Sequence, residues 1–453
     1  MRTFTSLGLG LGSGLRSSWL ILPAALALTG CGIIGGKGGG PKTPVNGDRA
    51  SILGGTEVLE ADPALASTPV TLPAPVAMPD WTQSGGNASK SYGHAALGAG
   101  TQQVWSASIA GGSSRARLAS APVVSAGKLY AIDTEATVHA FDAKSGAKLW
   151  TASIKSADAQ TKVQFGGGVS IDGERLYATT GMGDVAALNA ADGSVVWKVR
   201  PGGPLRGAPT LSNGNVYVMS QDNQLFALGQ ADGAVVWSDS GTVESTGVFG
   251  VAAPAAAQGS VIAGYSSGEL SAYRYENGRA LWGDALSRTT ISTSVATLTD
   301  IDADPVIDQG RVFAIGEGGR MASYELTSGQ RLWELNIGGI ATPLVVGDWV
   351  FVVTDKSKLF AITRATGKVR WISDLPAWRK PQKKTGAIRW RGPILAGGKL
   401  VLVSTEGAMA FVDPATGQTQ HEQDLGHGFS LSPIVADNML YMLTDEGRIL
   451  AYR

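Results

Sequence analysis

PVVSAGKLYAIDTEATVHAFDAKSGAKLW, residues 122–150, is a module that recurs along this chain of 453 residues. Its first and last residues, Pro and Trp, lie 28 positions apart. The same spacing separates Pro209 from Trp237, Pro254 from Trp282, Pro305 from Trp333, and Pro343 from Trp371. Two further copies, Val169–Trp197 and Pro393–His421, have one marker replaced, and an eighth copy begins at Pro433. A fixed period of this kind indicates a repeat architecture.

Each module contains two turn signals separated by short β-rich runs. One Gly lies 24 positions after the module start and follows a polar or small residue, as at Gly146 and Gly193. A second turn falls 14 positions in, as at Gly183 and Gly268. Tight turns with a positive φ favour Gly, and runs such as Trp349–Val353 favour strands. Four short antiparallel strands per module make one blade of a β-propeller.

The eighth copy ends at Arg453, before its last strand. The segment Val104–Ile109 matches Leu149–Ile154, which is the last strand of the first copy. We therefore expect the N-terminal strand to pair with the C-terminal blade, because ring closure removes open sheet edges. The sequence predicts an all-β fold, an eight-bladed β-propeller over residues 81–453 that is closed by this pairing.

Seven of the twelve Trp residues occupy the same repeat position. They could form an aromatic binding surface, but aromatic residues with a fixed period are typical of packing. A large indole with a single donor suits the seam between two blades. We therefore expect these Trp residues to pack between neighbouring blades.

The first thirty residues have the features of a targeting sequence. Arg2 and Arg16 precede the apolar run Trp19–Leu28, which is too short to span a bilayer. The run ends in Leu-Thr-Gly-Cys31, the pattern of a bacterial lipoprotein signal, and Cys31 is the only Cys. The alternative is an ordinary secretory signal with an incidental Cys. We expect residues 1–30 to be a cleaved signal peptide and Cys31 to carry the lipid.

Residues 31–80 have no apolar period and are rich in Gly, Pro, Ala and Thr. This composition predicts a flexible tether between the lipid and the propeller. Lys+Arg and Asp+Glu balance at 37 each, so the chain has no electrostatic footprint for nucleic acid. Contact with the membrane is expected through the lipid anchor only.

All variation in module spacing lies between a Trp and the next module start, with gaps of 10 to 23 residues. In a four-stranded blade these connections leave from one face, and the opposite face has only short turns. Binding is usually carried by variable loops on a rigid scaffold. The longest loops are Gly283–Asp304 and Ile372–Gly392.

The segment Ala140–Trp150 resembles the Trp-docking repeat of quinoprotein propellers. That repeat is shared by the PQQ-dependent dehydrogenases and the BamB family. Together with the lipobox, the tether and the closing strand, it resembles the BamB family from Cys31 to Arg453. The resemblance implies a non-catalytic periplasmic scaffold, without cofactor, that is lipid-anchored at the cell outer membrane. Its implied partners are the POTRA domains of the BamA-like barrel-inserting subunit, other subunits of that complex, and unfolded outer-membrane proteins.

The resemblance also implies partner-binding residues. An acidic pair that contacts the inserting subunit matches Asp300 and Asp302, and a Leu-Arg pair of the same contact is replaced here by Val248-Phe249. The acidic run could instead be a solvated loop that caps a strand. It does not fit an EF-hand, because its sixth position is Pro305 and its twelfth is Arg311. The second long loop has six basic residues and two Trp between Trp378 and Arg391, and a short basic run is often only solvated.

The enzyme alternative is a PQQ-dependent dehydrogenase. By resemblance, such an enzyme needs a vicinal disulfide, which a single Cys cannot form. His94, His139, His421 and His427 show no metal-ligand spacing, so no metal site is expected. A third possibility is a propeller that binds another ligand of the cell envelope.

Overall fold

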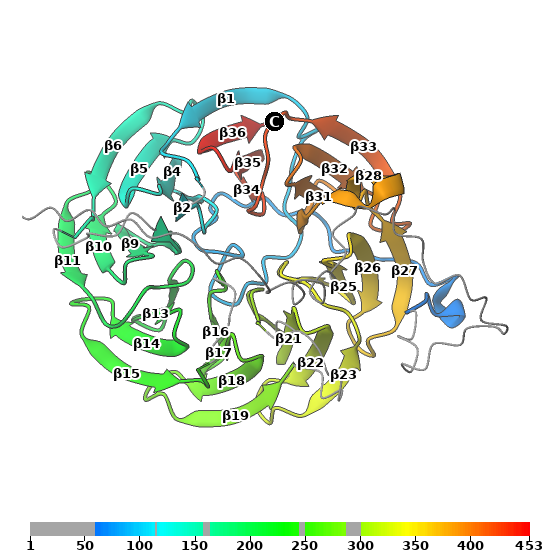
Figure 1. The fold of residues 1–453 in the computed structure, drawn as a ribbon, viewed down its shortest axis with the longest axis horizontal. Coiled ribbons are helices and arrows are strands. Elements are labelled where there is room, and N and C mark those ends of the chain that lie inside the picture. Colours follow the sequence, from blue (N-terminus) through cyan, green and yellow to red (C-terminus); the bar gives the residue numbers. More distant parts are fainter. Residues whose placement is uncertain (1–58, 114–115, 157–163, 244–249, 287–299) are drawn as a thin grey trace, which may run out of the picture. The chain divides into compact units, whose positions relative to one another are not determined.

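The computed structural model describes residues 59–113, 116–156, 164–243, 250–286 and 300–453. Within them, eight four-stranded antiparallel sheets follow one another around a central axis (Figure 1). We call the region around this axis, inside the innermost strands, the channel. The eight-bladed β-propeller predicted from the repeats is confirmed. Among the described residues, no helix has the length and apolar character needed to cross a membrane.

The first four blades follow the first four modules. The strands of blade 1 are β3 (Val123–Ser125), β4 (Lys128–Ile132), β5 (Thr137–Asp142) and β6 (Lys148–Ser153). Those of blade 2 are β8 (Gly167–Asp172), β9 (Arg175–Thr180), β10 (Val185–Asn189) and β11 (Val195–Val199). Those of blade 3 are β12 (Thr210–Ser212), β13 (Asn215–Met219), β14 (Gln224–Gly229) and β15 (Val235–Ser240). Those of blade 4 are β16 (Ala255–Ala257), β17 (Ser260–Gly264), β18 (Glu269–Arg274) and β19 (Ala280–Ala285).

The remaining blades complete the ring. The strands of blade 5 are β20 (Val306–Asp308), β21 (Arg311–Gly316), β22 (Arg320–Glu325) and β23 (Arg331–Leu335). Those of blade 6 are β24 (Leu344–Val346), β25 (Trp349–Val353), β26 (Lys358–Thr363) and β27 (Val369–Asp374). Those of blade 7 are β30 (Trp390–Ala396), β31 (Lys399–Ser404), β32 (Ala408–Val412) and β33 (Thr419–Asp424). Those of blade 8 are β34 (Ile434–Ala436), β35 (Met439–Leu443), β36 (Arg448–Tyr452) and β1 (Gln103–Ser108).

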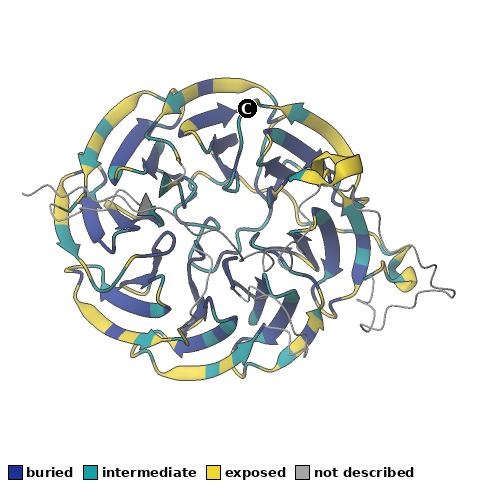
Figure 2. Ribbon diagram, in the orientation of Figure 1, coloured by how far each residue is buried: buried dark blue, intermediate teal, exposed yellow. Residues whose placement is uncertain are grey.

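Four short strands and two 3₁₀ turns lie outside the blades. They are the pair β2 (Ala116–Arg117) and β7 (Gln164–Phe165), the pair β28 (Trp378–Lys380) and β29 (Thr385–Ala387), and the turns η1 (Pro63–Leu65) and η2 (Pro381–Lys383). In the blades, the three inner strands are largely buried and the outermost strand is largely exposed (Figure 2). The core therefore consists of the seams between blades.

Seven of the eight seams between described blades are held by one Trp and one Gly, and His421 takes the Trp position at the seam between blades 7 and 8. The seven repeat-position indoles each donate a hydrogen bond to a backbone carbonyl of the next blade, over 2.7–3.2 Å. Each ring also covers the turn Gly of that blade, where a Cβ would lie only 2.4–2.7 Å from indole atoms. The repeat Gly is therefore required by the neighbouring Trp as well as by its positive φ. The predicted packing role of these Trp residues is confirmed.

Ring closure occurs as the sequence predicts. Strand β1 pairs antiparallel with β36, with Trp105 opposite Ala451 and Ser108 opposite Arg448. Trp105 then makes the same seam contact with blade 1 as the other repeat Trp residues make with their neighbours, through the carbonyl of Ala143. The first and last strands of the described propeller thus belong to a single blade.

An N-terminal segment that does not belong to any module crosses the channel. We call residues 73–97 the plug. Backbone amides of Val124, Ile171, Ala256 and Ile307, all two positions after a module start, donate to its carbonyls over 2.8–2.9 Å. The equivalent amides of blades 3 and 7 donate to plug side chains, and blade 8 donates through its inner turn. The plug therefore satisfies inner-edge amides that would otherwise line the channel.

Residues 59–80 differ from the expectation of a flexible tether. The Asp62 amide donates to the Val369 carbonyl at the start of β27, over 2.8 Å, and the Asp62 carboxylate pairs with Lys368. The Arg370 side chain donates to the Thr68 carbonyl over 2.9 Å. Residues 59–80 are thus bonded to the propeller, because backbone groups and charges supply contacts that an apolar pattern does not reveal. The remainder of the predicted tether lies outside the described residues.

The seam geometry predicts how stability depends on ring closure. Trp105→Ala removes a buried indole and its hydrogen bond, so we expect the free energy of unfolding to fall by about 3–5 kcal/mol. The neighbouring Val104 is 51% exposed, and Val104→Ala is expected to change stability by less than about 0.5 kcal/mol. Urea unfolding of both variants measures the difference. Equal stabilities would contradict the seam as the closing contact.

Candidate functional site

The connections between blades lie on one face of the ring, which we call the variable face. The turn between the first and second strand has two residues in every blade, as at Ala126-Gly127 and Asn213-Gly214. The turn between the third and fourth strand lies on the same side and has nearly constant length. An antiparallel blade places its other two connections on the opposite side. The predicted confinement of length variation to one face is therefore confirmed for the described residues.

A buried ion pair joins three of these connections. The Arg206 guanidinium, between blades 2 and 3, donates to the Asp302 carboxylate over 2.8 Å. It also donates to the carbonyls of Gly264 and Ile301. Arg206 is 1% exposed and Asp302 is 7% exposed, so this is an ion pair in the interior. Because a buried carboxylate needs a partner, Arg206 fixes the position of the predicted acidic loop.

The third connection approaches this ion pair at Gly250. A Cβ on Gly250 would lie 1.9 Å from an Arg206 nitrogen and 2.1 Å from an Asp302 oxygen. No side chain can therefore replace the glycine without moving the pair. Gly250 directly follows the predicted partner-binding residues Val248 and Phe249, which lie outside the described residues. The structure thus brings the chain next to Val248-Phe249 against the acidic loop.

The acidic pair is more buried than side chains that contact a partner directly would be. Asp300 is 1% exposed and Asp302 is 7% exposed. The Asp300 carbonyl accepts a hydrogen bond from the Glu317 amide, and the Ile301 amide donates a hydrogen bond to the Tyr265 carbonyl. The reason is that the loop end is threaded between blades 4 and 5 before β20 begins. Asp302 forms an ion pair with Arg206 and therefore does not form an exposed acidic patch.

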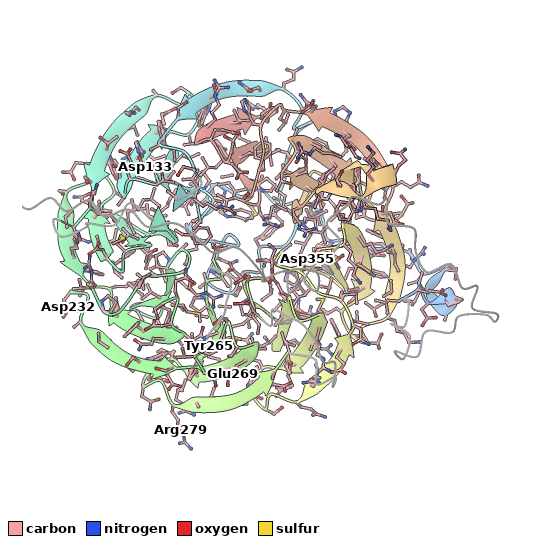
Figure 3. All side chains as sticks on the ribbon, in the orientation of Figure 1. Asp133, Asp232, Tyr265, Glu269, Arg279 and Asp355 are labelled. Carbon is pink, nitrogen blue, oxygen red and sulfur yellow. The ribbon has the colours of Figure 1, made fainter. Side chains whose placement is uncertain are left out.

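Several titratable groups gather near the channel mouth on the variable face. Burial raises the pKa of Asp302 to about 6 despite the opposing charge of Arg206. Burial, assisted by the charges of Asp302 and Asp355, raises the pKa of Glu317 to about 7. Burial also raises the pKa of Asp355, which lies toward the channel while Asp232 and Arg279 lie at the outer rim (Figure 3). The mouth therefore holds carboxyl groups that gain protons near neutral pH.

The basic loop of residues 378–391 folds into the small hairpin β28–β29 on the variable face. Its charges are partly engaged by the propeller. Arg379 lies 3.4 Å from the Glu406 carboxylate, and Arg389 donates to the Asp355 carbonyl over 2.9 Å. Trp390 is buried and donates to the Pro376 carbonyl, whereas Trp378 is exposed. The loop is thus an ordered projection from the variable face.

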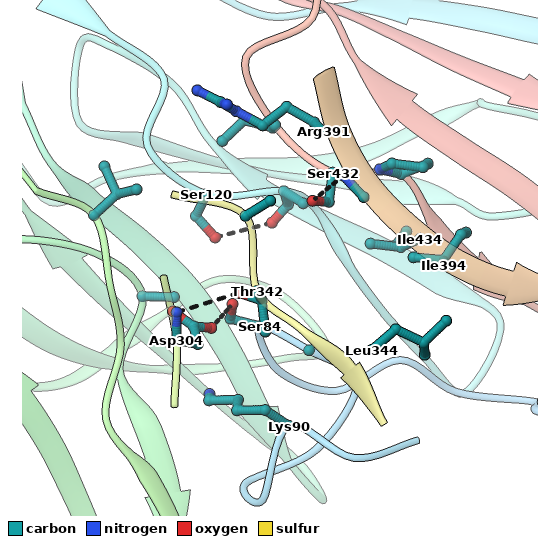
Figure 4. Close-up of a pocket in the computed structure, with 18 of the residues that line it drawn as sticks. Ser84, Lys90, Ser120, Asp304, Thr342, Leu344, Arg391, Ile394, Ser432 and Ile434 are labelled. Atoms are coloured by element: carbon teal, nitrogen blue, oxygen red, sulfur yellow. Dashed lines mark hydrogen bonds between the residues drawn. The ribbon is translucent and has the colours of Figure 1, made fainter. Parts of the chain in front are cut away.

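The channel contains a cavity of about 130 Å³ between the plug and the inter-blade connections (Figure 4). Lys90 lies at the plug end of this cavity and Arg391 at the other end. Apolar walls come from Leu344, Ile394 and Ile434. Because the plug crosses the short-turn side, the cavity lies closest to the variable face.

Arg206, the plug and the cavity were not predicted from the sequence. Arg206 lies 96 positions from Asp302 and occupies a connection without a repeat marker. A weak signal for the plug was present, since Trp81 lies outside the repeat position yet is buried against Tyr92. In the part of the chain that the structure describes, no group of three or more His, Cys, Asp or Glu residues could hold a metal ion.

Ring, seams and variable face define the class of protein: an eight-bladed propeller of PQQ-like repeats. A family model described as outer membrane protein assembly factor BamB matches residues 134–373 and 376–453. The chain therefore belongs to the BamB family. A relative of that name from Salmonella typhimurium is 29% identical over 352 residues, which cover 77% of this chain and 88% of the relative.

Solved structures agree on the fold. The crystal structure of BamB from Moraxella catarrhalis covers 78% of this chain and 97% of its own, with a TM-score of 0.62 and 19% identity. The quinohemoprotein alcohol dehydrogenase of Comamonas testosteroni covers 83% of this chain and 80% of its own, with a TM-score of 0.63 and 14% identity. Structural likeness alone does not separate assembly factor from dehydrogenase. The family model does.

The buried ion pair yields a stability prediction. Arg206→Met leaves the Asp302 carboxylate buried without its ion-pair partner, so we expect a loss of about 3–5 kcal/mol at pH 8. In Arg206→Met/Asp302→Leu both charges are gone, and the loss should be smaller than in the single variant. Chemical unfolding of the three proteins checks this. A double variant that is less stable than the single would contradict the bracing role.

The raised pKa of Glu317 yields a pH prediction. The folded protein holds this proton more tightly than the unfolded chain, so the associated stability is present at acidic pH and lost as pH rises through about 7. Glu317→Gln should therefore gain about 1–2 kcal/mol relative to the wild type between pH 5 and pH 8, allowing for partial solvent screening. Melting curves measure it, with the exposed Glu174→Gln as control. A constant difference across this range would refute it.

Proposed function

We propose that this chain is a non-catalytic assembly factor that binds the barrel-inserting subunit of an outer-membrane protein assembly complex and assists insertion of β-barrel proteins. The observation that carries the proposal is the match of the BamB family model to nearly every blade. Two relatives named outer membrane protein assembly factor BamB match this chain over most of their own length. A PQQ-dependent dehydrogenase is the competing function, and it shares only the fold.

The proposed partner surface is the variable face around the channel mouth. Its support is that three connections converge there on the Arg206–Asp302 pair and that the basic hairpin β28–β29 projects from the same face. The buried acids hold the connections in place, and Val248 and Phe249 supply an apolar contact. Asp300 and Asp302 thus contribute to binding mainly by positioning. An apolar contact surrounded by polar groups that are held in place is typical of an interface hot spot.

The proposed location is the outer membrane, with a lipid on Cys31 and the propeller in the periplasm. The support is the Leu-Thr-Gly-Cys31 sequence together with the family membership. Residues 1–58, which include Cys31, lie outside the described residues.

Co-purification tests the partner surface. A Val248→Ser/Phe249→Ser variant, expressed from its full-length form in a Gram-negative host, should recover about tenfold less barrel-inserting subunit than the wild type, because the apolar anchor is lost. Val235→Ser/Val236→Ser is the matched control, since these two exposed valines lie on the outer strand β15. Unchanged recovery with the first variant, or equal loss with both, would reject this surface. A complete absence of the inserting subunit from the wild-type preparation would reject the function itself.

A further inference from the structure

Lys90 is a buried cation that the proposed scaffold role does not use. It lies on the plug, is 2% exposed and lines the central cavity. Its ammonium donates to the Thr210 hydroxyl over 3.0 Å, and the Thr210 proton is itself donated to the Pro254 carbonyl. An ammonium has three donors, so two are not used by these contacts. Among the described residues, no carboxylate lies within 4.0 Å of this nitrogen.

The nearby acid Asp304 is already engaged. One of its oxygens accepts from the Ser84 hydroxyl over 2.6 Å, and the other accepts from the Ala253 amide over 2.8 Å. Asp304 favours the charged form of Lys90 from a distance, while burial lowers the pKa of Lys90 to about 8. A buried charge without an ion pair is costly and needs an explanation.

The backbone holds Lys90 in place at a further cost. Its φ is 64°, in the left-handed region that disfavours residues other than Gly. Gly85 packs against it so closely that a Cβ there would lie 3.0 Å from three Lys90 carbon atoms. Strained residues that persist against such a cost are often found at functional sites. The backbone conformation of the plug therefore holds the Lys90 ammonium at the cavity.

The cavity wall also offers further donors. Two carboxylates line it too, but Asp302 accepts from Arg206, and Asp304 accepts from Ser84 and Ala253. The Thr342 hydroxyl accepts the Asp304 amide, and the Ser432 hydroxyl accepts the Gly392 amide. Neither hydroxyl proton is given to a protein acceptor within the part of the chain that the structure describes. Figure 4 shows Thr342 and Ser432 between Lys90 and Arg391 along the cavity. A complementary ligand supplies oxygen acceptors and a negative charge.

We propose that the central cavity is a carboxylate-binding site in which the Lys90 ammonium binds the carboxylate and the cavity hydroxyls bind other oxygen atoms of the same ligand. A cavity of about 130 Å³ admits a small carboxylate or one acidic side chain. The carboxylate comes either from a free small molecule or from an acidic side chain of the protein that docks on the variable face. The second source rests on the proposed function, whereas the first does not.

Calorimetric titration of the intact, signal-processed protein at pH 8 with sodium acetate, and separately with sodium succinate, tests the free-ligand source. Sodium chloride at equal ionic strength is the blank. We expect saturable binding with proton uptake, seen as a dependence of the heat on the buffer, because a bound carboxylate favours the ammonium form of Lys90. Lys90→Met should weaken binding about tenfold or more, and Thr342→Val should weaken it less.

The exposed Lys148→Met is the matched control and should bind like the wild type. If neither probe binds, but Lys90→Met lowers co-purification of the inserting subunit and Lys148→Met does not, the carboxylate belongs to the partner. If neither probe binds and Lys90→Met changes nothing in co-purification, the proposal is wrong. Binding that is equally strong in the wild type and in Lys90→Met also overturns it. Thermal melting confirms that each variant is folded before it is compared.

Discussion

The contact on which the whole molecule depends is the indole of one blade lying over the turn glycine of the next. Seven such contacts repeat around the ring, and each combines a hydrogen bond to a carbonyl with a ring placed where any Cβ would clash. Because both partners belong to the same repeat positions, each seam fixes the angle between consecutive blades. The closing strand β1 brings Trp105 into this pattern, so blade 8 contacts blade 1 in the same way. Among the described blades, the seam between blades 7 and 8 lacks this contact, because His421 takes the Trp position there. Burial of large aromatic area then stabilises closure at both ends of the chain.

Once the ring is fixed, its two faces differ in kind. The short-turn face is crossed by the plug, whose contacts with the inner strands satisfy amides that point into the channel. The variable face has the longer connections, and Arg206 and Asp302 bind three of them to one another at the channel mouth. Burying this ion pair costs desolvation free energy, and its structural effect is to fix the position of loops that form the surface. The cavity lies between the plug and the inter-blade connections, with Lys90 on one side and Arg391 on the other.

The fold could be predicted from the sequence because the spacing of Pro, Gly and Trp records a strictly periodic structure. Val104–Ile109 was recognisable as the missing strand because it copies Leu149–Ile154. The site was harder to predict. Asp302 and Arg206 lie in two different inter-blade connections of unequal length, and no periodic marker links the two residues. Trp81, Tyr92 and Lys90 belong to a segment that occurs once, so its repeated contacts with the blades are visible only in space. Burial of Asp300 depends on how the loop end threads between two blades, which composition does not record.

We propose that the rigid ring presents the variable face to its partner and uses the short-turn face for structural contacts. Hydrogen–deuterium exchange of the propeller, with and without the periplasmic domains of the barrel-inserting subunit, distinguishes the two faces. We expect new protection in the connections of the variable face, at residues 200–209, 250–254, 300–304 and 376–391, and unchanged exchange at the two-residue turns such as Ala126-Gly127. Protection concentrated on those turns, or spread equally over both faces, would show that the variable face is not the binding face.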